Sequence, residues 1–409
     1  MIYLGLDWAE DHHDVALMDE AGTVLDERRI GDTMEGVVLI HELVDQHEPD
    51  PSKVMVGTES VHCLVPQALV AAGYMVYEIN PMASSRYRDR HHLSGAKSDR
   101  GDAKMLADAV RTDSHNHRPY VGNSDFAEGI KVLARTHQTL IHDRQDQVNN
   151  LRSTLRQYYP SLLLAFPGFA SPSERDSQDA MALVEKAPTP AQGRALTTSQ
   201  ITTVLRQAGR KRALDRRAQE IREALRVPQL ETTPIVTQSY GSSAQAIAGI
   251  VRVMTIQIDL LTAELASRFE QHPDAKIICS LPGLGPVLGA RALAEFGDEP
   301  NRYTDARARK NYATTSPVTK ASGKLRVVTT RRGGNRRLGE PSLRWAFSAA
   351  QSSPGAKRYY DALRSRQKTH AQAVRAVANR MVGILHACLE KRVLYNETIA
   401  WPEPLDMAA

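Results

Sequence analysis

Cysteine and aromatic residues are scarce in this sequence. The chain of 409 residues contains only Cys63, Cys279 and Cys388, which are too scattered for a Cys-x-x-Cys zinc ligand pair and too few for a disulfide framework. Aromatic residues make up 5% of the chain, which argues against a single-strand binder that depends mainly on base stacking. The shortage of cysteine also excludes a small secreted domain that is stabilised by disulfide bonds.

Long apolar runs are also missing. No uninterrupted apolar stretch reaches the roughly 18 residues that a membrane helix needs. The segment from Met1 to Asp7 lacks the basic start and apolar core of a secretory signal. We therefore expect a protein of the reducing cytoplasm without a membrane partner. With 42% hydrophobic and 24% charged residues, the chain can bury substantial cores in two or three domains.

Basic residues are rare at the start of the chain, and acidic residues are rare near residue 320, although the net charge is only +5. Residues 1–60 contain 15 Asp and Glu against 3 Lys and Arg, and residues 301–340 contain 11 Lys and Arg against 2 Asp and Glu. A basic block of this kind is expected of a protein that binds phosphate backbones. A solvated charged surface would have the same composition.

The first 120 residues show short apolar runs that are typical of strands. Runs at 2–7, 13–17, 23–26, 54–59 and 74–80 predict strands, and a glycine-containing turn joins the second run to the third. Residues 64–72 and a stretch from Asp99, with Ser98 as N-cap, predict helices. Two runs end on a carboxylate, Asp7 and Glu59. This pattern favours a ribonuclease-H-like α/β domain.

After Ser124 the sequence predicts helices and no further strands. Apolar spacings of three, four and seven mark long amphipathic helices over 130–158 and 247–265, which would pair as a coiled coil or pack in a bundle. Prolines between them predict a loop-rich insertion at 160–198. We therefore divide the chain into an α/β domain at 1–123, a helical coiled-coil region at 124–272 and a mostly helical domain at 273–409.

The third region contains a glycine-rich turn, Leu281-Pro-Gly-Leu-Gly-Pro286, followed by a helical stretch at 287–296. In a helix-hairpin-helix element, glycines such as Gly283 and Gly285 let backbone N–H groups approach a phosphate at a helix N-terminus. A simple tight turn has the same pattern. The basic block that follows is what favours the phosphate-binding interpretation.

Four acids in the first quarter of the chain, Asp7, Glu59, Asp99 and Asp102, suit a divalent-cation site. Asp99 and Asp102 are three residues apart at an expected helix start, so both carboxylates fall on one face. With Asp7 and Glu59 at the ends of neighbouring strands, four oxygen donors could hold one or two Mg²⁺ ions. Each acid alone is more typical of a cap or surface residue, so the prediction depends on the set.

An isolated Ser322-Gly-Lys324 lies inside the basic block. It is followed by five arginines, Arg326, Arg331, Arg332, Arg336 and Arg337. A serine hydroxyl can keep a broken nucleic-acid strand attached, and the cations suit backbone contact or a charged transition state. Taken alone, Ser322 is more typical of a turn serine before glycine. Ser316 is the second candidate nucleophile.

In their order, these motifs resemble the DEDD transposases of the IS110 insertion-sequence family, which are bridge-RNA-guided recombinases. The likeness covers almost the whole chain, through the spaced acids, the helical middle and the distal Leu-Pro-Gly-Leu-Gly, Ser-Gly-Lys and Gly-Gly-Asn motifs. It implies a RuvC-like domain, a coiled coil and a transposase domain with a helix-hairpin-helix-like element.

The resemblance also implies roles for individual residues. Asp7, Glu59, Asp99 and Asp102 would be a metal-binding tetrad, and Ser322 would attack a DNA phosphate to leave a transient 5′-phosphoserine. Implied partners are donor and target double-stranded DNA, a noncoding guide RNA and further copies of the chain, as a dimer or tetramer that forms composite sites. The implied location is the prokaryotic cytoplasm, in association with the nucleoid.

The chain departs from the family pattern in two places, at Ser60-Val-His-Cys63 and in the longer stretch between Asn335 and Leu343-Arg344. Two other functions stay open. A metal-dependent junction nuclease would use the four acids and leave Ser322 without a role. A non-catalytic nucleic-acid-binding regulator would use only the glycine-rich turn and the basic block.

Overall fold

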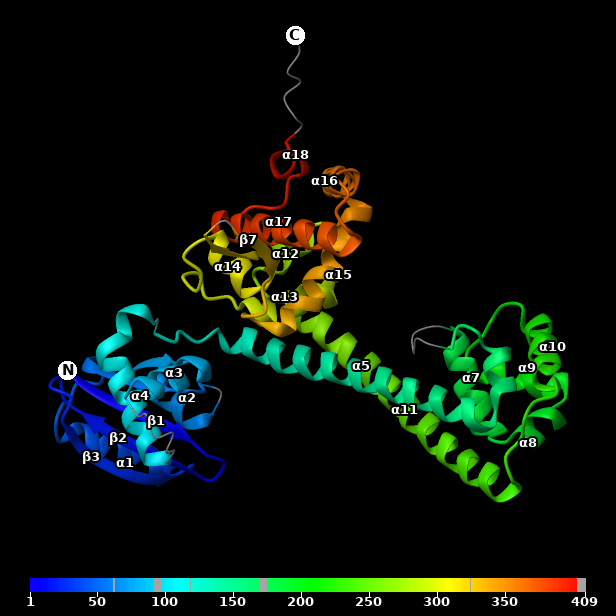
Figure 1. Cartoon of the computed structure of the whole chain (residues 1–409), viewed down its shortest axis with the longest axis horizontal. Helices are drawn as coiled ribbons and strands as arrows, with labels where there is room; N and C mark the ends of the chain where they lie inside the picture. Colours follow the sequence, from blue (N-terminus) through cyan, green and yellow to red (C-terminus); the bar gives the residue numbers. More distant parts are fainter. Residues whose placement is uncertain (62, 92–97, 118, 170–174, 324, 403–409) are drawn as a thin grey trace, which may run out of the picture. The chain divides into compact units, whose positions relative to one another are not determined.

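The computed structural model describes residues 1–61, 63–91, 98–117, 119–169, 175–323 and 325–402. The chain forms two compact units, Met1–Gly122 and Asn123–Ala409 (Figure 1). The first is an α/β unit, and the described part of the second is helical apart from one hairpin. The predicted mixed α/β start and helical remainder are confirmed, whereas the division into three regions stays a prediction.

A five-stranded sheet forms the middle of the first unit. Its order is β3-β2-β1-β4-β5, in which β1 pairs antiparallel with β2 and parallel with β4. The strands are β1 (Ile2–Trp8), β2 (His12–Met18), β3 (Val24–Gly31), β4 (Val54–Thr58) and β5 (Met75–Glu78). All five predicted strands are present, although β3 continues five residues beyond the predicted run because it pairs along β2 as far as Gly31.

Helices pack on the sheet of the first unit. They are α1 (Met34–Asp45), α2 (Leu64–Ala71), α3 (Pro81–His91) and α4 (Asp99–Asp113), with the 3-10 helices η1 (Pro51–Lys53) and η2 (Ser114–Asn116). Helix α4 begins where predicted, since the Ser98 hydroxyl accepts a hydrogen bond from the Gly101 N–H at 3.2 Å. One core contains Leu4 and Val56 of the sheet together with Ile40 of α1, all of them fully buried.

Helix α4 lies directly on the sheet because two glycines leave room for its backbone. Gly5 of β1 and Gly57 of β4 are opposite one another in the strand register. A Cβ on Gly5 would lie 1.8 Å from the carbonyl oxygen of Ala103, and one on Gly57 would lie 2.5 Å from that of Leu106. These glycines therefore set how closely α4, and the acids at its start, approach the sheet.

We expect Gly5→Ala to destabilise the first unit by about 1–3 kcal/mol or more, because the new methyl group would displace a helix backbone in a packed core. Gly31→Ala is the matched control: a Cβ there would meet Thr33 no closer than 3.6 Å, and a cost within about 0.5 kcal/mol is expected. Urea unfolding compares the two variants. Equal midpoints would mean that α4 can move off the sheet without loss of stability.

Two long helices of the second unit, α5 (Asp125–Tyr158) and α11 (Pro234–Glu270), pack side by side in opposite directions (Figure 1). His137 Nε2 lies 2.8 Å from Thr262 Oγ1, and Arg144 Nη1 donates to Thr255 Oγ1 at 3.2 Å. Both predicted amphipathic helices are therefore present, and they pair within one chain.

Helix α11 is apolar enough to cross a membrane by length and composition, with a mean hydropathy of 1.6 over its most apolar window, 17% of which is buried. It is the single such helix in the described part of the chain. Length and composition alone are a weak indication, because helices of soluble proteins pass the same test. Its hydroxyl contacts to the polar helix α5 fit a packed bundle.

The segment predicted to be loop-rich, 160–198, instead contains helices, so that prediction was wrong. With α9 and α10, these helices build a core against α5 and α11 that includes Phe166, Leu183 and Ile221. Pro160 and Pro190 each stand at the first position of a helix, where a proline without an N–H is tolerated. The helices are α6 (Pro160–Ala165), α7 (Arg175–Lys186), α8 (Pro190–Ala195), α9 (Thr198–Gln207) and α10 (Leu214–Leu225).

A separate core in the second unit joins the start of α5 and the end of α11 to the C-terminal helices. This core contains Phe269, Trp345 and Met381, each of which is at most 2% exposed. The helices are α12 (Ala275–Ser280), α13 (Pro286–Phe296), α14 (Ala306–Tyr312), α15 (Arg336–Ser352), α16 (Pro354–Ser365), α17 (His370–Lys391) and α18 (Glu397–Ala400).

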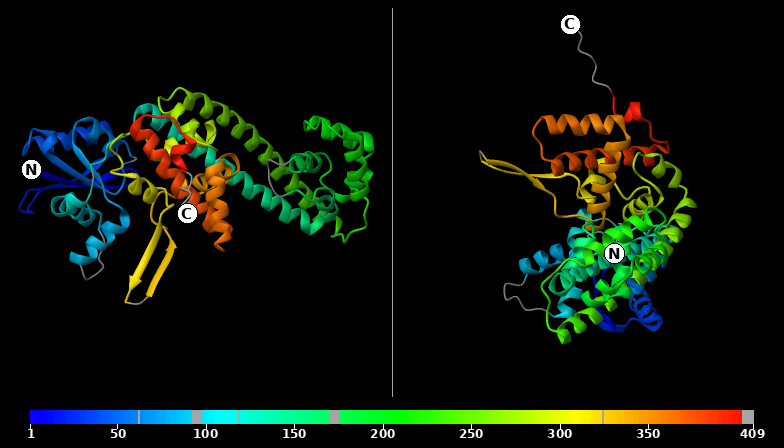
Figure 2. Two further views of the ribbon diagram at one scale, coloured as in Figure 1. Left: turned by 90° about the horizontal axis from the view of Figure 1, so that it is seen from above. Right: turned by 90° about the vertical axis from the view of Figure 1, so that its right-hand side faces the viewer.

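One hairpin interrupts this helical part, formed by β6 (Pro317–Ser322) and β7 (Leu325–Thr330). We expected no strand beyond Ser124, and this prediction was wrong. The β-branched residues that favour strands here, such as Val318 and Val327, are not buried. Without a buried face, the hairpin lacks the apolar alternation that predicts a strand. Figure 2 shows it extending away from the helices of its unit.

His137 is expected to make stability fall as the pH drops from about 6.5 to about 4. Burial, together with Arg291 and Arg144, lowers the pKa of His137 to about 4. Its Nδ1 accepts a hydrogen bond from Arg291 at 3.2 Å, which leaves Nε2 to donate to Thr262, as a neutral ring requires. In the unfolded chain the histidine has a pKa of about 6.5, so below that pH it binds a proton that the folded protein excludes. The free energy of unfolding therefore falls by up to about 3 kcal/mol by pH 4.

Urea unfolding at a series of pH values measures this loss. A His137→Gln variant should show a flatter dependence of unfolding free energy on pH than the wild type over that range. His47→Gln, which removes an exposed histidine of the first unit, is the control and should keep the wild-type slope. Identical slopes in all three proteins would contradict the assignment to His137.

Candidate functional site

Five acids stand near one edge of the first unit, which we call the acidic edge: Asp7, Asp14, Glu59, Asp99 and Asp102. Among the described residues, Asp7, Glu59 and Asp102 do not belong to the close group of possible metal ligands that Asp14 and Asp99 form with His12. Asp7 lies opposite Asp14 in the register of β1 and β2, and Glu59 directly follows β4, the parallel neighbour of β1. Gly5 and Gly57, two residues earlier on these strands, face α4. Because side chains alternate along a strand, Asp7 and Glu59 face α4 as well. Asp99 and Asp102 stand in the first turn of α4.

Helix α3 contacts two of the predicted acids with side chains four residues apart. The Ser84 hydroxyl donates to Glu59 Oε1, and Arg88 Nη2 lies 2.8 Å from Asp102 Oδ1. Ser84 is 1% exposed and Asp102 5% exposed. Residues four apart on a helix share a face, so one face of α3 fixes the orientation of both carboxylates.

Arg29 of β3 joins two further acids of the edge. Its Nη2 lies 2.7 Å from Asp14 Oδ2 and 3.5 Å from Asp99 Oδ2. The hydrogen bond with Asp14 raises the pKa of Arg29. His12 Nε2 is 4.0 Å from Asp14 Oδ2. Ligand atoms of His12, Asp14 and Asp99 all lie within 4.8 Å of one another.

The three close donors, His12, Asp14 and Asp99, could hold a divalent cation. Carboxylate oxygens predominate, which suits hard ions, and one imidazole is compatible with Mn²⁺ as well. His12 Nε2 is buried and has no hydrogen-bond partner among the described residues. Asp14 is 3% exposed, and Arg29 compensates its negative charge. A metal ion bound beside Asp14 could compensate this charge together with Arg29. Of the three close ligand residues, sequence reasoning had selected only Asp99.

His12, Asp14 and the arginines at this edge were missed by the sequence prediction. No cysteine stands at zinc-ligand spacing from His12, so no local motif marks it as a metal ligand. The signal for Asp14 was present: a carboxylate directly precedes an apolar run, Val15 to Met18, in a strand expected to pair with the one that ends on Asp7. Arg29 and Arg88 have no local signal, since only tertiary packing brings them to the acids.

Ser322, the predicted nucleophile, ends β6 at the tip of the hairpin in the second unit. It pairs with Leu325 in the register, and Gly323 after it has φ of +54°, a conformation that favours glycine. Ser322 is exposed. Ser316, the second candidate, precedes the hairpin and its hydroxyl lies 3.4 Å from Asn379 Oδ1. Of the two serines, Ser322 is therefore the one with the more accessible side chain.

The predicted phosphate-binding turn lies between α12 and α13. Gly283 has φ of +82°, and a Cβ there would lie 2.8 Å from the Ala349 nitrogen of α15. Trp345 of the same helix donates its indole N–H to the Pro282 carbonyl at 2.9 Å. Gly283 therefore serves the packing of the turn on α15. Gly285 is exposed at the start of α13 and has open space around it.

Of the predicted basic residues, Arg326 stands on β7, and Arg331, Arg332, Arg336 and Arg337 follow the hairpin. Arg326, Arg332, Arg336 and Arg337 are exposed, Arg331 is half-buried, and Lys324 lies outside the described residues. Asn335 caps α15 by accepting from the Arg337 N–H at 2.9 Å, and its amide donates to the buried Glu295 at 2.6 Å. Although burial raises it, the pKa of Glu295 is held below its usual value by hydrogen bonds from Arg135 and Asn335. This anchor fixes the loop that carries the arginines.

Comparison with known proteins agrees with this division of residues. A family model for DEDD transposases of the IS110 type, described as "Transposase", matches residues 4–160, and one described as "Transposase IS116/IS110/IS902 family" matches residues 275–361. The first match therefore contains the whole acidic edge, and the second contains the glycine-rich turn, the hairpin and the arginines.

Similar proteins cover the chain from end to end. The "Mini-circle putative transposase for IS117" of Streptomyces coelicolor is 40% identical over 409 residues, which is 100% of this chain and 98% of that protein. The "Insertion element IS110 uncharacterized 43.6 kDa protein" of the same organism is 29% identical over 83% of this chain and 81% of its own length. A 42 kDa protein of insertion element IS900 from Mycobacterium paratuberculosis is 26% identical over 97% of both chains.

These matches define a DNA transposase, an enzyme that cleaves and joins DNA. The chain belongs to the IS110 family of insertion-element transposases. The family assignment confirms the resemblance noted in the sequence, and it suggests use of a divalent metal, for which the acidic edge provides ligands.

Proposed function

We propose that this transposase is an RNA-guided DNA recombinase that moves an insertion element through a covalent serine intermediate. The observation that carries the proposal is that the acids gather on one edge of a five-stranded sheet, while an exposed serine stands at a hairpin tip within a basic segment. The strand order and the acids around α4 support a ribonuclease-H-like, RuvC-like unit. The guide RNA and the oligomer come from the family resemblance alone.

In this proposal Asp7, Glu59, Asp99 and Asp102 hold Mg²⁺. A bound divalent ion would neutralise charge on the phosphate and on the departing oxygen. The protein's own part is orientation: Ser84 and Arg88 fix the Glu59 and Asp102 carboxylates, and Arg29 holds the Asp99 side of the edge. Asp14 and His12 add ligands beyond the four that sequence patterns select.

Ser322 would provide the nucleophile. Its oxygen forms a bond to phosphorus while the bond from phosphorus to the 3′ oxygen breaks; the serine proton leaves and the 3′ oxygen gains one. The resulting 5′-phosphoserine keeps the phosphodiester energy until another 3′-hydroxyl reverses the step. Arginines of the following segment, such as Arg326 and Arg332, would contact the DNA backbone. We propose that the enzyme acts on nucleoid DNA in the bacterial cytoplasm.

A second candidate function is a metal-dependent junction nuclease. It is favoured by the fact that the acids and Ser322 belong to different units of the chain. In that case water would replace Ser322 as the nucleophile, and no protein–DNA bond would form. The non-catalytic regulator does not agree with the family assignment.

The deciding experiment is a search for a covalent protein–DNA adduct. Cells that carry the native element with its flanks would be lysed under denaturing conditions, and the adducted peptide would be mapped by mass spectrometry. The proposal expects the adduct on Ser322, with co-purifying RNA in the native complex. Metal-dependent cleavage without any adduct would instead support the nuclease, and an adduct without RNA would remove the guided part of the proposal.

A further inference from the structure

A pocket of about 450 Å³ lies at the root of the hairpin, away from the Ser322 tip. The end of β7 forms one wall, and α16, α17 and the turn between them form the others. Its polar and aromatic lining includes Thr330, Tyr359, Lys368, Gln372, Arg375 and Asn379, together with Thr315 and Thr329. The pocket lies within the second unit, and all of its lining residues belong to the part of the chain that the structure describes.

The charged and amide side chains of this pocket offer hydrogen-bond donors and positive charge. Lys368 and Arg375 are the cations, and no acidic residue is among the lining residues that the structure describes. Gln372 Oε1 is already used, since it accepts from the Thr369 N–H at 3.0 Å to cap α17. Asn379 Oδ1 is approached by the Thr315 and Ser316 hydroxyls at 3.4 Å each. Both amides therefore present their NH₂ groups as the remaining donors.

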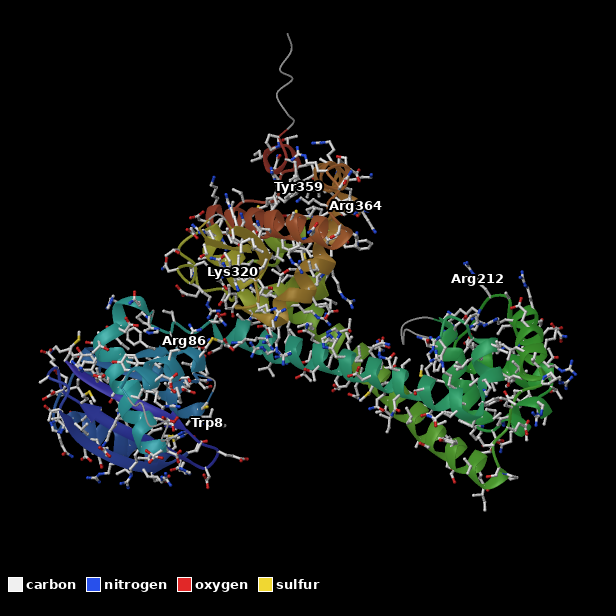
Figure 3. The ribbon with its side chains drawn as sticks, viewed as in Figure 1. Trp8, Arg86, Arg212, Lys320, Tyr359 and Arg364 are labelled. Carbon is white, nitrogen blue, oxygen red and sulfur yellow. The ribbon has the colours of Figure 1, made fainter. Side chains whose placement is uncertain are left out.

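Tyr359 is the aromatic residue of the pocket, and Trp401 and Arg380 hold its ring in place. It packs on Trp401 with ring centroids 5.6 Å apart, and the Arg380 guanidinium lies 5.7 Å from the Tyr359 ring centroid and 4.4 Å from that of Trp401. Figure 3 shows Tyr359 in this part of the unit, near α16 and α18. A ring that is fixed before binding loses little conformational entropy when a flat ligand stacks on it.

Arg375 connects the pocket to the hairpin, because its Nη1 donates to Thr330 Oγ1 at 3.4 Å. A ligand with a negative charge would therefore contact a residue that also holds the last residue of β7. The turn that carries Lys368 is fixed too, since the Lys368 N–H donates to the Leu363 carbonyl at 3.1 Å. Both cations thus stand on anchored backbone.

We propose that this pocket binds one unstacked nucleotide of a nucleic-acid strand. A nucleotide carries a phosphate for the cations, ring nitrogens and carbonyl oxygens that accept hydrogen bonds from amide groups, and a flat base for Tyr359. Drug-sized ligands occupy pockets of roughly 300–1,000 Å³, and a single nucleotide is within this range. Because DNA and RNA share this chemistry, the sugar decides between the two sources.

Binding of short oligonucleotides to the full-length protein tests the proposal without cleavage. The probes are a fluorescent thymidine octamer, the same octamer with abasic sugars at the inner positions, a uridine octamer and a deoxyuridine octamer. The wild type should bind the thymidine octamer about tenfold more tightly than the abasic one, which is roughly the effect of one stacked base. Tyr359→Leu should lose this preference, whereas Tyr359→Phe should keep it, because the ring and not the hydroxyl stacks on the base. An unchanged unfolding temperature of Tyr359→Leu would exclude a folding defect.

Arg375→Gln should weaken binding of all probes and reduce the salt dependence by about one counterion, since it removes one phosphate contact. Arg366→Gln, an exposed arginine near the pocket that does not line it, is the charge-matched control and should leave the base preference unchanged. A wild-type preference that persists in Tyr359→Leu, or an Arg375→Gln variant that behaves like Arg366→Gln, would overturn the proposal. Tighter binding of the uridine octamer than of a deoxyuridine octamer, which differs from it only in the sugar, would identify RNA as the source, and the reverse order would identify DNA.

This inference depends only on the handling of nucleic acid by a transposase. It can fail while the serine mechanism holds, because no cleavage enters the measurement. It can also hold if Ser322 proves to have no catalytic role, since Tyr359 and Arg375 would still bind the nucleotide.

Discussion

An Asp102→Asn variant is expected to lose DNA strand cleavage and to keep DNA binding. Asp102 is nearly buried in the first turn of α4 and pairs with Arg88 at 2.8 Å. Asparagine keeps the size of the side chain and can still accept from Arg88, so the fold should persist. The lost negative charge would weaken metal binding, and the cleavage rate should fall by about a thousandfold, which corresponds to several kcal/mol of charge stabilisation.

Cleavage of labelled substrate DNA at increasing Mg²⁺ concentration measures the effect, and Mn²⁺ provides a second readout. A metal that binds only the folded state raises the unfolding temperature, so the wild type should be stabilised by Mn²⁺ and the variant should not. Asp108→Asn is the matched control. Asp108 stands on the same helix but pairs with Arg111 and Tyr87 away from the acidic edge. If both variants lost cleavage and binding together, Asp102 would have a structural role.

The fold of the first unit could be predicted because its signals are local. Apolar runs mark the strands, and the side chain of Ser98 caps α4 where the sequence indicates. The acids at strand ends and at a helix start could also be selected, since strand order and helix periodicity bring such positions to one edge. What the pattern could not supply was the set of neighbours: Arg29 and Arg88 reach the acids from β3 and α3 through tertiary packing alone.

The second unit was harder to predict for a different reason. Prolines that suggested loops proved to begin helices, because the first helical position does not need an N–H. The hairpin lacks a buried face, so alternation of apolar and polar residues could not reveal it. Gly283 was selected for phosphate contact, yet its positive φ and its lack of a side chain also allow the close contact with α15. A glycine motif alone does not separate ligand approach from packing.

A Ser322→Ala variant is expected to abolish both the covalent adduct and DNA joining. Ser322 is exposed at a turn, and alanine removes only one hydroxyl oxygen there, so the change in stability should stay within about 0.5 kcal/mol. DNA binding should also be unchanged, because the arginines of the segment remain. A loss of joining at full stability and full binding would therefore reflect the chemistry of that hydroxyl group.

Ser316→Ala separates the two candidate serines. Its hydroxyl lies near Asn379 at the base of the hairpin, and its removal should leave the adduct on Ser322. An adduct that vanishes only in Ser316→Ala would reassign the nucleophile to Ser316. Metal-dependent cutting that survives in both variants would show that neither serine attacks the phosphate. In that case the acidic edge would act with water, as in a nuclease, and the exposed hairpin would be a DNA-binding element, because its lysine and arginine side chains would still bind the backbone.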